Sequence, residues 1–221
     1  MEGIFISIEG GEGSGKTTVI NILKEKLKDY PVIFTREPGG APISEKIREI
    51  ILAPENSQMS PETEALLYAA SRAQHMEEKI IPALEQGKIV ITDRFVHSSY
   101  AYQCGARGLS HVGVMSINTF ATKNIMPEIV FFLDVPPKVA FERIKNREKD
   151  RLEREGLEFH EKVYNSFRRM EENENTFWAL DGTKKPEVLA KEMLRVILAY
   201  YSFKNNIYYS DDYVKFCAKL K

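Results

Sequence analysis

Eight residues near the N-terminus carry the clearest chemical signal of this chain. The run Gly10-Gly-Glu-Gly-Ser-Gly-Lys-Thr17 matches G-x-x-x-x-G-K-[ST], a loop that binds nucleotide phosphates. Its glycines permit a tight turn that points backbone N–H groups inward. Lys16 is placed to reach the β- and γ-phosphates, and the Thr17 hydroxyl is placed to hold Mg²⁺. The expected nucleotide-binding residues are Gly10, Gly11, Glu12, Gly13, Ser14, Gly15, Lys16, Thr17 and Thr18.

Further charged residues stand just after two short apolar runs. Arg36 and Glu37 follow residues 31–35, and Asp93 and Arg94 follow residues 88–92. Carboxyl ends of parallel strands meet at one crevice, so these side chains and Glu12 should converge there, with Asp93 near the metal. Two arginines beside carboxylates suit a reaction in which donor and acceptor are both polyanions, although structural ion pairs are the alternative.

The elements that must position these residues alternate along the chain. Apolar runs predict five strands, separated by helical patterns, which indicates an α/β P-loop NTPase fold with a five-stranded parallel sheet and helices on both faces. The expected strands are 4–8, 31–35, 88–92, 128–134 and 176–181; the expected helices are 17–28, 43–52, 60–86, about 98–123, one opening at Pro136-Pro137, and 186 to about 201. We expect one P-loop domain over 1–202, with a short lid over about 143–156, and a C-terminal extension over 203–221.

Composition and charge are those of an ordinary globular enzyme. The chain has 221 residues, 43% hydrophobic and 29% charged, with a formal net charge of −1 from 31 basic and 32 acidic side chains. No positive field favours a nucleic-acid or membrane partner. Cys104 and Cys217 are expected to be free thiols. No leader pattern or apolar span is visible, which predicts a cytoplasmic protein.

An ordered set of motifs resembles the thymidylate kinase family. The set comprises residues 9–18, 35–40, 68–75, 93–94 and 98–103, and the likeness runs from Ile4 to about Tyr201. The resemblance implies transfer of the γ-phosphoryl group of ATP to dTMP, giving dTDP for dTTP biosynthesis, with Mg²⁺ as cofactor. It also implies a homodimer.

The resemblance further implies roles for individual residues. Tyr68 would stack on the thymine ring and Arg72, four positions on and thus on the same helix face, would bond its carbonyl edge. Core packing of Tyr68 with a surface Arg72 is the alternative from the residues alone. Arg36 and Arg94 would clamp the acceptor phosphate. The implied substrate-binding residues are Glu12, Arg36, Glu37, Pro38 (a candidate for a cis peptide bond), Tyr68, Arg72, Arg94, Ser99, Tyr102 (facing the 2′ position) and Gln103.

A basic run from Arg143 to Arg154 is the expected lid. Charge runs are usually solvated helix faces. The phosphate loop has no arginine, however, and the sequence resembles the lid-arginine class seen in many bacteria. The expected catalytic residues are Lys16, Arg94, Glu12, Arg147 and Arg151, with Arg151 favoured of the two lid arginines.

Two other classes of function stay open. A kinase for another nucleoside monophosphate is the nearer alternative. A GTP switch is less favoured, because the chain lacks an Asn-Lys-x-Asp guanine motif and Thr122-Lys-Asn124 does not supply it. A partition-type P-loop ATPase is also less favoured, because residues 10–14 contain no lysine and it would not explain Arg36 or Arg72.

Overall fold

Five parallel strands form the centre of the molecule. The structure, a computed structural model, describes residues 3–146 and 150–206. The strand order is β2-β3-β1-β4-β5, and all neighbouring strands pair in parallel, which confirms the predicted sheet. The strands are β1 Ile4–Glu9, β2 Val32–Arg36, β3 Ile89–Asp93, β4 Ile129–Asp134 and β5 Phe177–Asp181.

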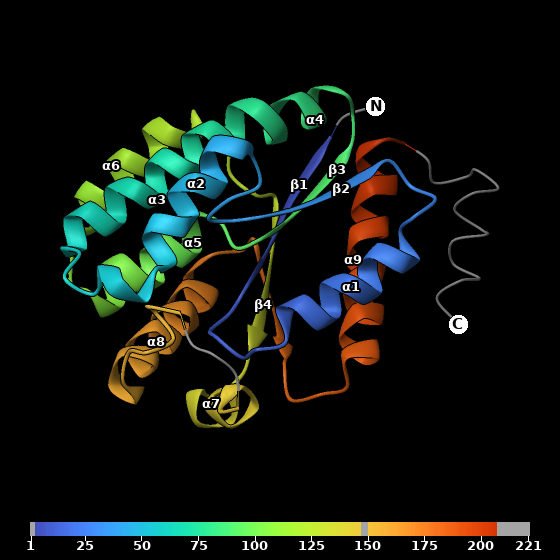
Figure 1. Ribbon diagram of the computed structural model, residues 1–221. Coiled ribbons are helices and arrows are strands. Elements are labelled where there is room, and N and C mark those ends of the chain that lie inside the picture. The colour runs from blue at the N-terminus through green and yellow to red at the C-terminus, as the bar shows by residue number, and fades with distance from the viewer. Residues whose placement is uncertain (1–2, 147–149, 207–221) are drawn as a thin grey trace.

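Helices cover both sides of this sheet. Figure 1 shows α1 and α9 packed together on one side, while α2, α3 and α6 group on the other, as expected for this fold class. None of the helices within the described residues is both long and apolar enough to cross a bilayer. The helices are α1 Lys16–Lys26, α2 Pro42–Leu52, α3 Pro61–His75, α4 Ile81–Glu85, α5 Val96–Ser99, α6 His111–Thr122, α7 Pro137–Ile144, α8 Leu157–Asn173 and α9 Pro186–Lys204.

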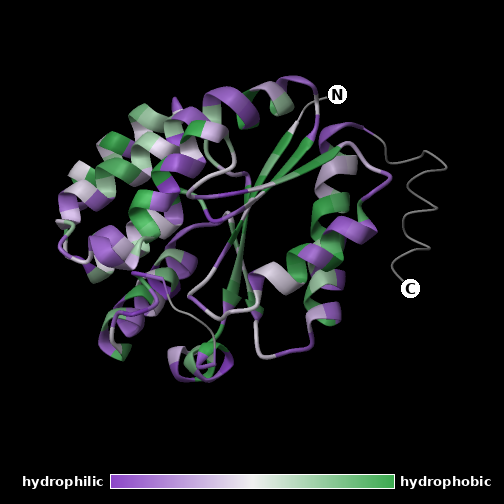
Figure 2. Ribbon diagram, viewed as in Figure 1, coloured by the Kyte–Doolittle hydropathy of each residue, from purple (hydrophilic) through white to green (hydrophobic). Residues whose placement is uncertain are grey.

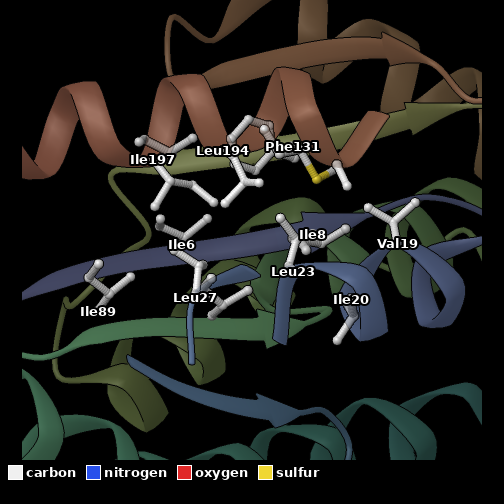
Figure 3. Close-up of a cluster of buried hydrophobic side chains, with 14 of the residues drawn as sticks. Ile6, Ile8, Val19, Ile20, Leu23, Leu27, Ile89, Phe131, Leu194 and Ile197 are labelled. Carbon is white, nitrogen blue, oxygen red and sulfur yellow. The ribbon is translucent and has the colours of Figure 1, made fainter. Parts of the chain in front are cut away.

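The central strand β1 is buried on both faces. Figure 2 shows the strands as a mostly apolar layer, and Figure 3 shows Ile6 and Ile8 of β1 beside Leu23 of α1 and Ile197 of α9. The alternate residue Phe5 packs into a second cluster on the opposite face. Because successive strand residues point to opposite faces, both helical layers are anchored on one strand, and the loop after Glu9 is fixed at its end.

The predicted helix over 60–86 is interrupted. Ser60 caps α3 as expected, since its hydroxyl accepts a hydrogen bond from the Thr63 amide at 3.2 Å. A π-helical segment, Met76–Ile80, then separates α3 from α4. Pro82 has no N–H to offer the preceding turn, so the irregularity lies ahead of the proline rather than at it.

The prediction of helix over about 98–123 is also corrected. A π-helical segment, Tyr100–Ala106, follows α5. Non-helical residues, among them Gly108 with a positive φ of 76°, then lead into α6. Sequence reasoning did not predict α8 either. Its signal is nevertheless visible, because Phe159, Val163 and Phe167 are buried at helical spacing.

Candidate active site

A cavity of about 660 Å³ lies at the carboxyl ends of the strands and gathers most of the predicted site residues. The phosphate loop, the ends of β2 and β3, α3, the Tyr100–Ala106 segment and α7 all contribute to its lining. The predicted residues that line it are Glu12, Gly13, Ser14, Gly15, Lys16, Thr17, Thr18, Arg36, Glu37, Pro38, Tyr68, Arg72, Asp93, Arg94, Ser99, Tyr102 and Gln103. Gly10 and Gly11 are held at its edge through Lys16.

The phosphate loop is closed around the Lys16 ammonium group. Its Nζ donates to the carbonyl oxygens of Gly10 and Gly11 at 2.9 and 3.0 Å and to the Ser14 hydroxyl at 3.2 Å. Burial, with Arg94 nearby, lowers the pKa of Lys16 to about 8. The loop also needs glycine at position 13, because an added Cβ would lie 2.4 Å from the Ala140 carbonyl oxygen. Positive charge is therefore concentrated where a phosphate chain would lie.

Arg94 is locked to the phosphate loop. It takes a left-handed φ of 70°, its Nη1 donates to the Gly10 carbonyl at 2.9 Å, and its Nη2 lies 2.6 Å from Glu12 Oε1. Burial alone would raise the pKa of Glu12, but Arg94 and Lys16 hold it at about 2. The Tyr102 hydroxyl also donates to Glu12, at 3.2 Å. Glu12 is thus an ionised acceptor that joins the side chains of Arg94 and Tyr102.

Sequence reasoning missed the carboxylate that holds the turn after β3, which carries Arg94. Glu9, fully buried at the end of β1, accepts hydrogen bonds from the Phe95 amide at 2.8 Å and the Ser98 hydroxyl at 2.6 Å. Burial raises the pKa of Glu9. Ser98 in turn accepts from Arg94 Nη1 at 3.2 Å. Glu9 therefore positions the turn that carries Arg94.

Thr17 and Asp93 line the same cavity and suit a hydrated Mg²⁺ ion. Asp93 Oδ1 is buried and has no hydrogen-bond partner among residues 3–146 and 150–206. An uncompensated buried carboxylate oxygen needs a partner, and Mg²⁺ prefers a small number of oxygen ligands together with waters and substrate phosphates. The residues present therefore fit the ion that the phosphate loop implies.

The far end of the cavity is built around Arg72, which is 1% exposed. Its Nε donates to Glu37 Oε2 at 2.6 Å, while its Nη1 donates to Ser99 and to Asn118 of α6. The peptide bond between Glu37 and Pro38 is cis. These contacts use Nε and Nη1, and no residue within the described ranges bonds the remaining nitrogen, Nη2, which can therefore serve a ligand. Nothing in the spacing of Asn118 could have revealed its role, since it lies 46 positions after Arg72 and reaches it only through the tertiary fold.

His75 supports Glu37 from behind. Its ring nitrogens contact Glu37 Oε1 at 3.0 Å and the Thr35 hydroxyl at 2.6 Å. Glu37, expected to bind substrate, therefore contacts His75 through one carboxylate oxygen and Arg72 through the other.

A second missed residue lies near Arg36. Arg36 lines the cavity and pairs with Glu45 at 2.9 Å. Arg48 lines it too, and its Nη1 donates to the Pro38 carbonyl at 2.8 Å. Burial, with the charge of Arg36, lowers the pKa of Arg48. This part of the cavity is thus more cationic than the sequence motifs indicated.

Arg151, the favoured lid arginine, lies apart from the expected arrangement. Arg151 does not line the cavity: its Nε donates to the Ile51 carbonyl at 2.7 Å, and its Nη2 forms a 2.7 Å ion-pair contact with Glu64 that lacks hydrogen-bond alignment. Arg147 lies outside the described residues. Arg143 does line the cavity, where its Nη1 is 3.4 Å from the Ser14 carbonyl oxygen. The basic side chain beside the loop is therefore Arg143, which sequence reasoning included only as the start of the lid.

Comparisons with known proteins agree on one family. The family model described as thymidylate kinase matches residues 8–193. The chain is 54% identical over 175 residues to the thymidylate kinase of Oceanobacillus iheyensis, covering 77% of this chain and 78% of that protein. It is 47% identical over 203 residues to that of Bacillus velezensis, covering 89% and 96%. It is 43% identical over 208 residues to that of Enterococcus faecalis, covering 91% and 98%.

Proposed function

This chain belongs to the thymidylate kinase family and is a dTMP kinase, and we propose that it transfers the γ-phosphoryl group of ATP to dTMP within the cavity described above. One observation carries the proposal. The phosphate loop, two arginines at strand ends and the Tyr68–Arg72 face of α3 line one cavity, so donor and acceptor nucleotides can meet there.

The donor end is the phosphate loop. Lys16 would exchange its loop carbonyl partners for β- and γ-phosphate oxygens, and the amino end of α1 adds its dipole. Thr17 and Asp93 would hold Mg²⁺, which would neutralise negative charge on the transferring phosphoryl group.

The acceptor end holds the phosphate of dTMP. Arg36 and Arg94 would clamp it, while Glu12 orients Arg94 and lies near Tyr102, which faces the sugar. The nucleophile is a phosphate oxygen that is already ionised at neutral pH. No general base is needed, and the side chains act by positioning and by charge neutralisation.

The base end recognises thymine. Tyr68 would stack on the ring, Arg72 would donate to its carbonyl edge, and Ser99 and Gln103 would complete the lining. Burial raises the pKa of Tyr68, so this side chain meets the base as a neutral ring. The buried position of Arg72, fixed by Glu37, Ser99 and Asn118, supports a role in recognition.

We assign the bridging cation at the loop to Arg143. The contacts of Arg143 Nη1 with the Gly13 and Ser14 carbonyl oxygens of the loop support this assignment. Arg147 stays a second candidate for this role. Arg151 is proposed instead to fasten the residues after the lid to α2 and α3, because both of its described contacts lead there.

We propose that the active form is a homodimer that pairs through α3 and α6. These helices pack on each other and expose apolar side chains on one face, including Leu66 (57% exposed), Val112 (66%), Met115 (42%) and Phe120 (87%). A shallow hollow lined by Ala73, Met115 and Phe120 lies on the same face. Exposed patches of this kind mark interaction surfaces, and a second copy fits because the face carries few charges.

We place the enzyme in the cytoplasm, where its nucleotide substrates occur, and divide the chain into one kinase domain over 1–202 and an extension over 203–221. Of these extension residues, 207–221 lie outside the described part.

The proposal is tested by coupled ADP release with ATP, Mg²⁺ and, in turn, dTMP, dUMP, ribose TMP, dCMP, AMP and GMP. We expect strong preference for dTMP, lost in Lys16→Ala and in Arg72→Ala. Preference for another monophosphate would favour the kinase alternative. ATP loss indifferent to every monophosphate would favour an ATPase or switch.

A further inference from the structure

A buried carboxylate that no motif includes lies directly behind the base end of the cavity. Glu64 is on α3, four and eight positions before Tyr68 and Arg72, and is 1% exposed. Positions separated by four lie along one helix face, so Glu64 shares a face of α3 with Tyr68 and Arg72. Those two residues line the cavity, whereas Glu64 does not.

The partners of Glu64 come from two directions. Its Oε1 accepts from Nε2 of Gln103, a cavity residue, at 2.9 Å. Its Oε2 lies 3.1 Å from Arg107 Nη2 and 2.7 Å from Arg151 Nη2. Burial alone would raise the pKa of Glu64, but hydrogen bonds from Arg107 and Gln103 lower it below its usual range. The group facing Gln103 is thus an ionised carboxylate.

An ionised carboxylate can only accept hydrogen bonds. The Gln103 amide must therefore turn its NH₂ group toward Glu64, which directs its carbonyl oxygen away from Glu64. Among the residues that the structure describes, no donor reaches Gln103 Oε1. The result is a cavity side chain whose free polar atom is an acceptor.

We propose that Glu64 is a specificity-determining positioning residue: by fixing the Gln103 amide, it presents an acceptor to the base and selects pyrimidines with an N3–H donor. This inference rests on the proposed function, because it takes Gln103 and Arg72 as the readers of the base edge. Thymine and uracil offer an N3–H donor beside the O4 acceptor. Cytosine offers the reverse, an N3 acceptor beside a 4-amino donor.

Arg72 completes the pattern. Its free nitrogen, Nη2, is a donor and matches O4, while Gln103 Oε1 is an acceptor and matches N3–H. Cytosine would face a donor with its amino group and an acceptor with its bare nitrogen, so both contacts would fail. A site that leaves buried polar groups unpaired rejects the wrong ligand strongly.

The test is Glu64→Gln, with kcat/KM measured for dTMP and dCMP. A neutral amide at position 64 can present either end to Gln103, so the Gln103 amide can reverse. We expect the dTMP:dCMP ratio of kcat/KM to fall about ten-fold or more, the scale of one hydrogen bond. Equilibrium binding of dTMP and dCMP without ATP should move in the same way. An unchanged ratio in folded Glu64→Gln overturns the proposal.

Two matched variants separate the positioning of the Gln103 amide from a general loss of stability around Glu64. Glu64→Asp keeps an acceptor-only group and should keep the ratio while losing stability. Arg107→Met removes an ion pair of the same carboxylate but leaves the bond to Gln103, so it should lower Tm and keep the ratio. An equal fall of the ratio in Arg107→Met would overturn the proposal.

Loss of a buried charge could unfold Glu64→Gln. The double variant Glu64→Gln with Arg107→Met keeps the net charge of the cluster, and it carries the same expectation and the same overturning result. A wild-type enzyme that does not use dTMP would contradict the proposed function. The comparison of dTMP:dCMP ratios among the variants tests only the role of Glu64.

Discussion

Arg94 Nη2 lies 2.6 Å from Glu12 Oε1, and the same guanidinium donates through Nη1 to the Gly10 carbonyl. Arg94, proposed to hold the acceptor phosphate, is thereby tied to the phosphate loop, proposed to hold the donor. The planar guanidinium lets two nitrogens reach two separate acceptors at once. In the proposed reaction, this one side chain would help to set the relative placement of the two phosphates.

Arg94→Lys should lower kcat/KM for dTMP by about 10²–10³-fold, the loss seen when one charge-stabilising donor is removed. A single ammonium cannot meet Gly10, Glu12 and a phosphate together. Steady-state kinetics with dTMP varied measures the effect, and thermal unfolding checks that the fold is retained. Activity within about three-fold of wild type would show that a point charge suffices.

The affinity for ATP should depend on pH through Lys16, whose pKa is lowered to about 8. Above pH 8 the free enzyme loses this charge, whereas bound phosphates favour the charged form and raise the pKa again. ATP binding above pH 8 should therefore take up a proton and weaken as pH rises. Calorimetry at pH 8.5 in two buffers of different ionisation enthalpy measures the uptake. Lys16→Met is the control and should show no uptake from this group.

Arg143 and Arg151 should respond differently to removal. Arg143→Ala should lower kcat by about 10²-fold with little change in Tm, because Arg143 contacts the loop from an exposed position. Arg151→Ala should instead lower the unfolding free energy by about 1–3 kcal/mol, since it leaves the Ile51 carbonyl and Glu64 short of partners. Its kcat should change less than about three-fold. The reverse pattern would restore Arg151 to the catalytic role.

Phe120→Asp should convert the proposed dimer to monomer. Phe120 is 87% exposed on α6, and a charge placed in an apolar contact between identical surfaces meets its own copy across the two-fold axis. Sedimentation of wild type and variant at equal concentration measures the change. Val188→Asp, at an exposed apolar position on α9, is the control and should sediment as wild type does. A monomeric wild type would contradict the α3–α6 interface.

The phosphate loop and the five strands could be read from the sequence because each depends on local spacing: glycines at fixed positions and apolar runs act over a few residues. The placement of the loop at the carboxyl ends of parallel strands then followed from a general property of such sheets. The roles of Tyr68 and Arg72 came from the family resemblance, because the residues alone left core packing of Tyr68 open. The break in the 98–123 helix was not readable, because π-helical turns and local packing have no simple periodic signature.

The sequence by itself therefore determined the fold class, the nucleotide loop and the residues at strand ends. Only the tertiary structure decided which charges pair with which. Arg72 meets Asn118 at a separation of 46 positions, Arg151 contacts Glu64 instead of entering the cavity, and Arg143 takes the place beside the loop. A charged side chain has many possible partners within reach of a folded chain. The partner it takes is set by burial, because a buried charge must be neutralised wherever packing places it.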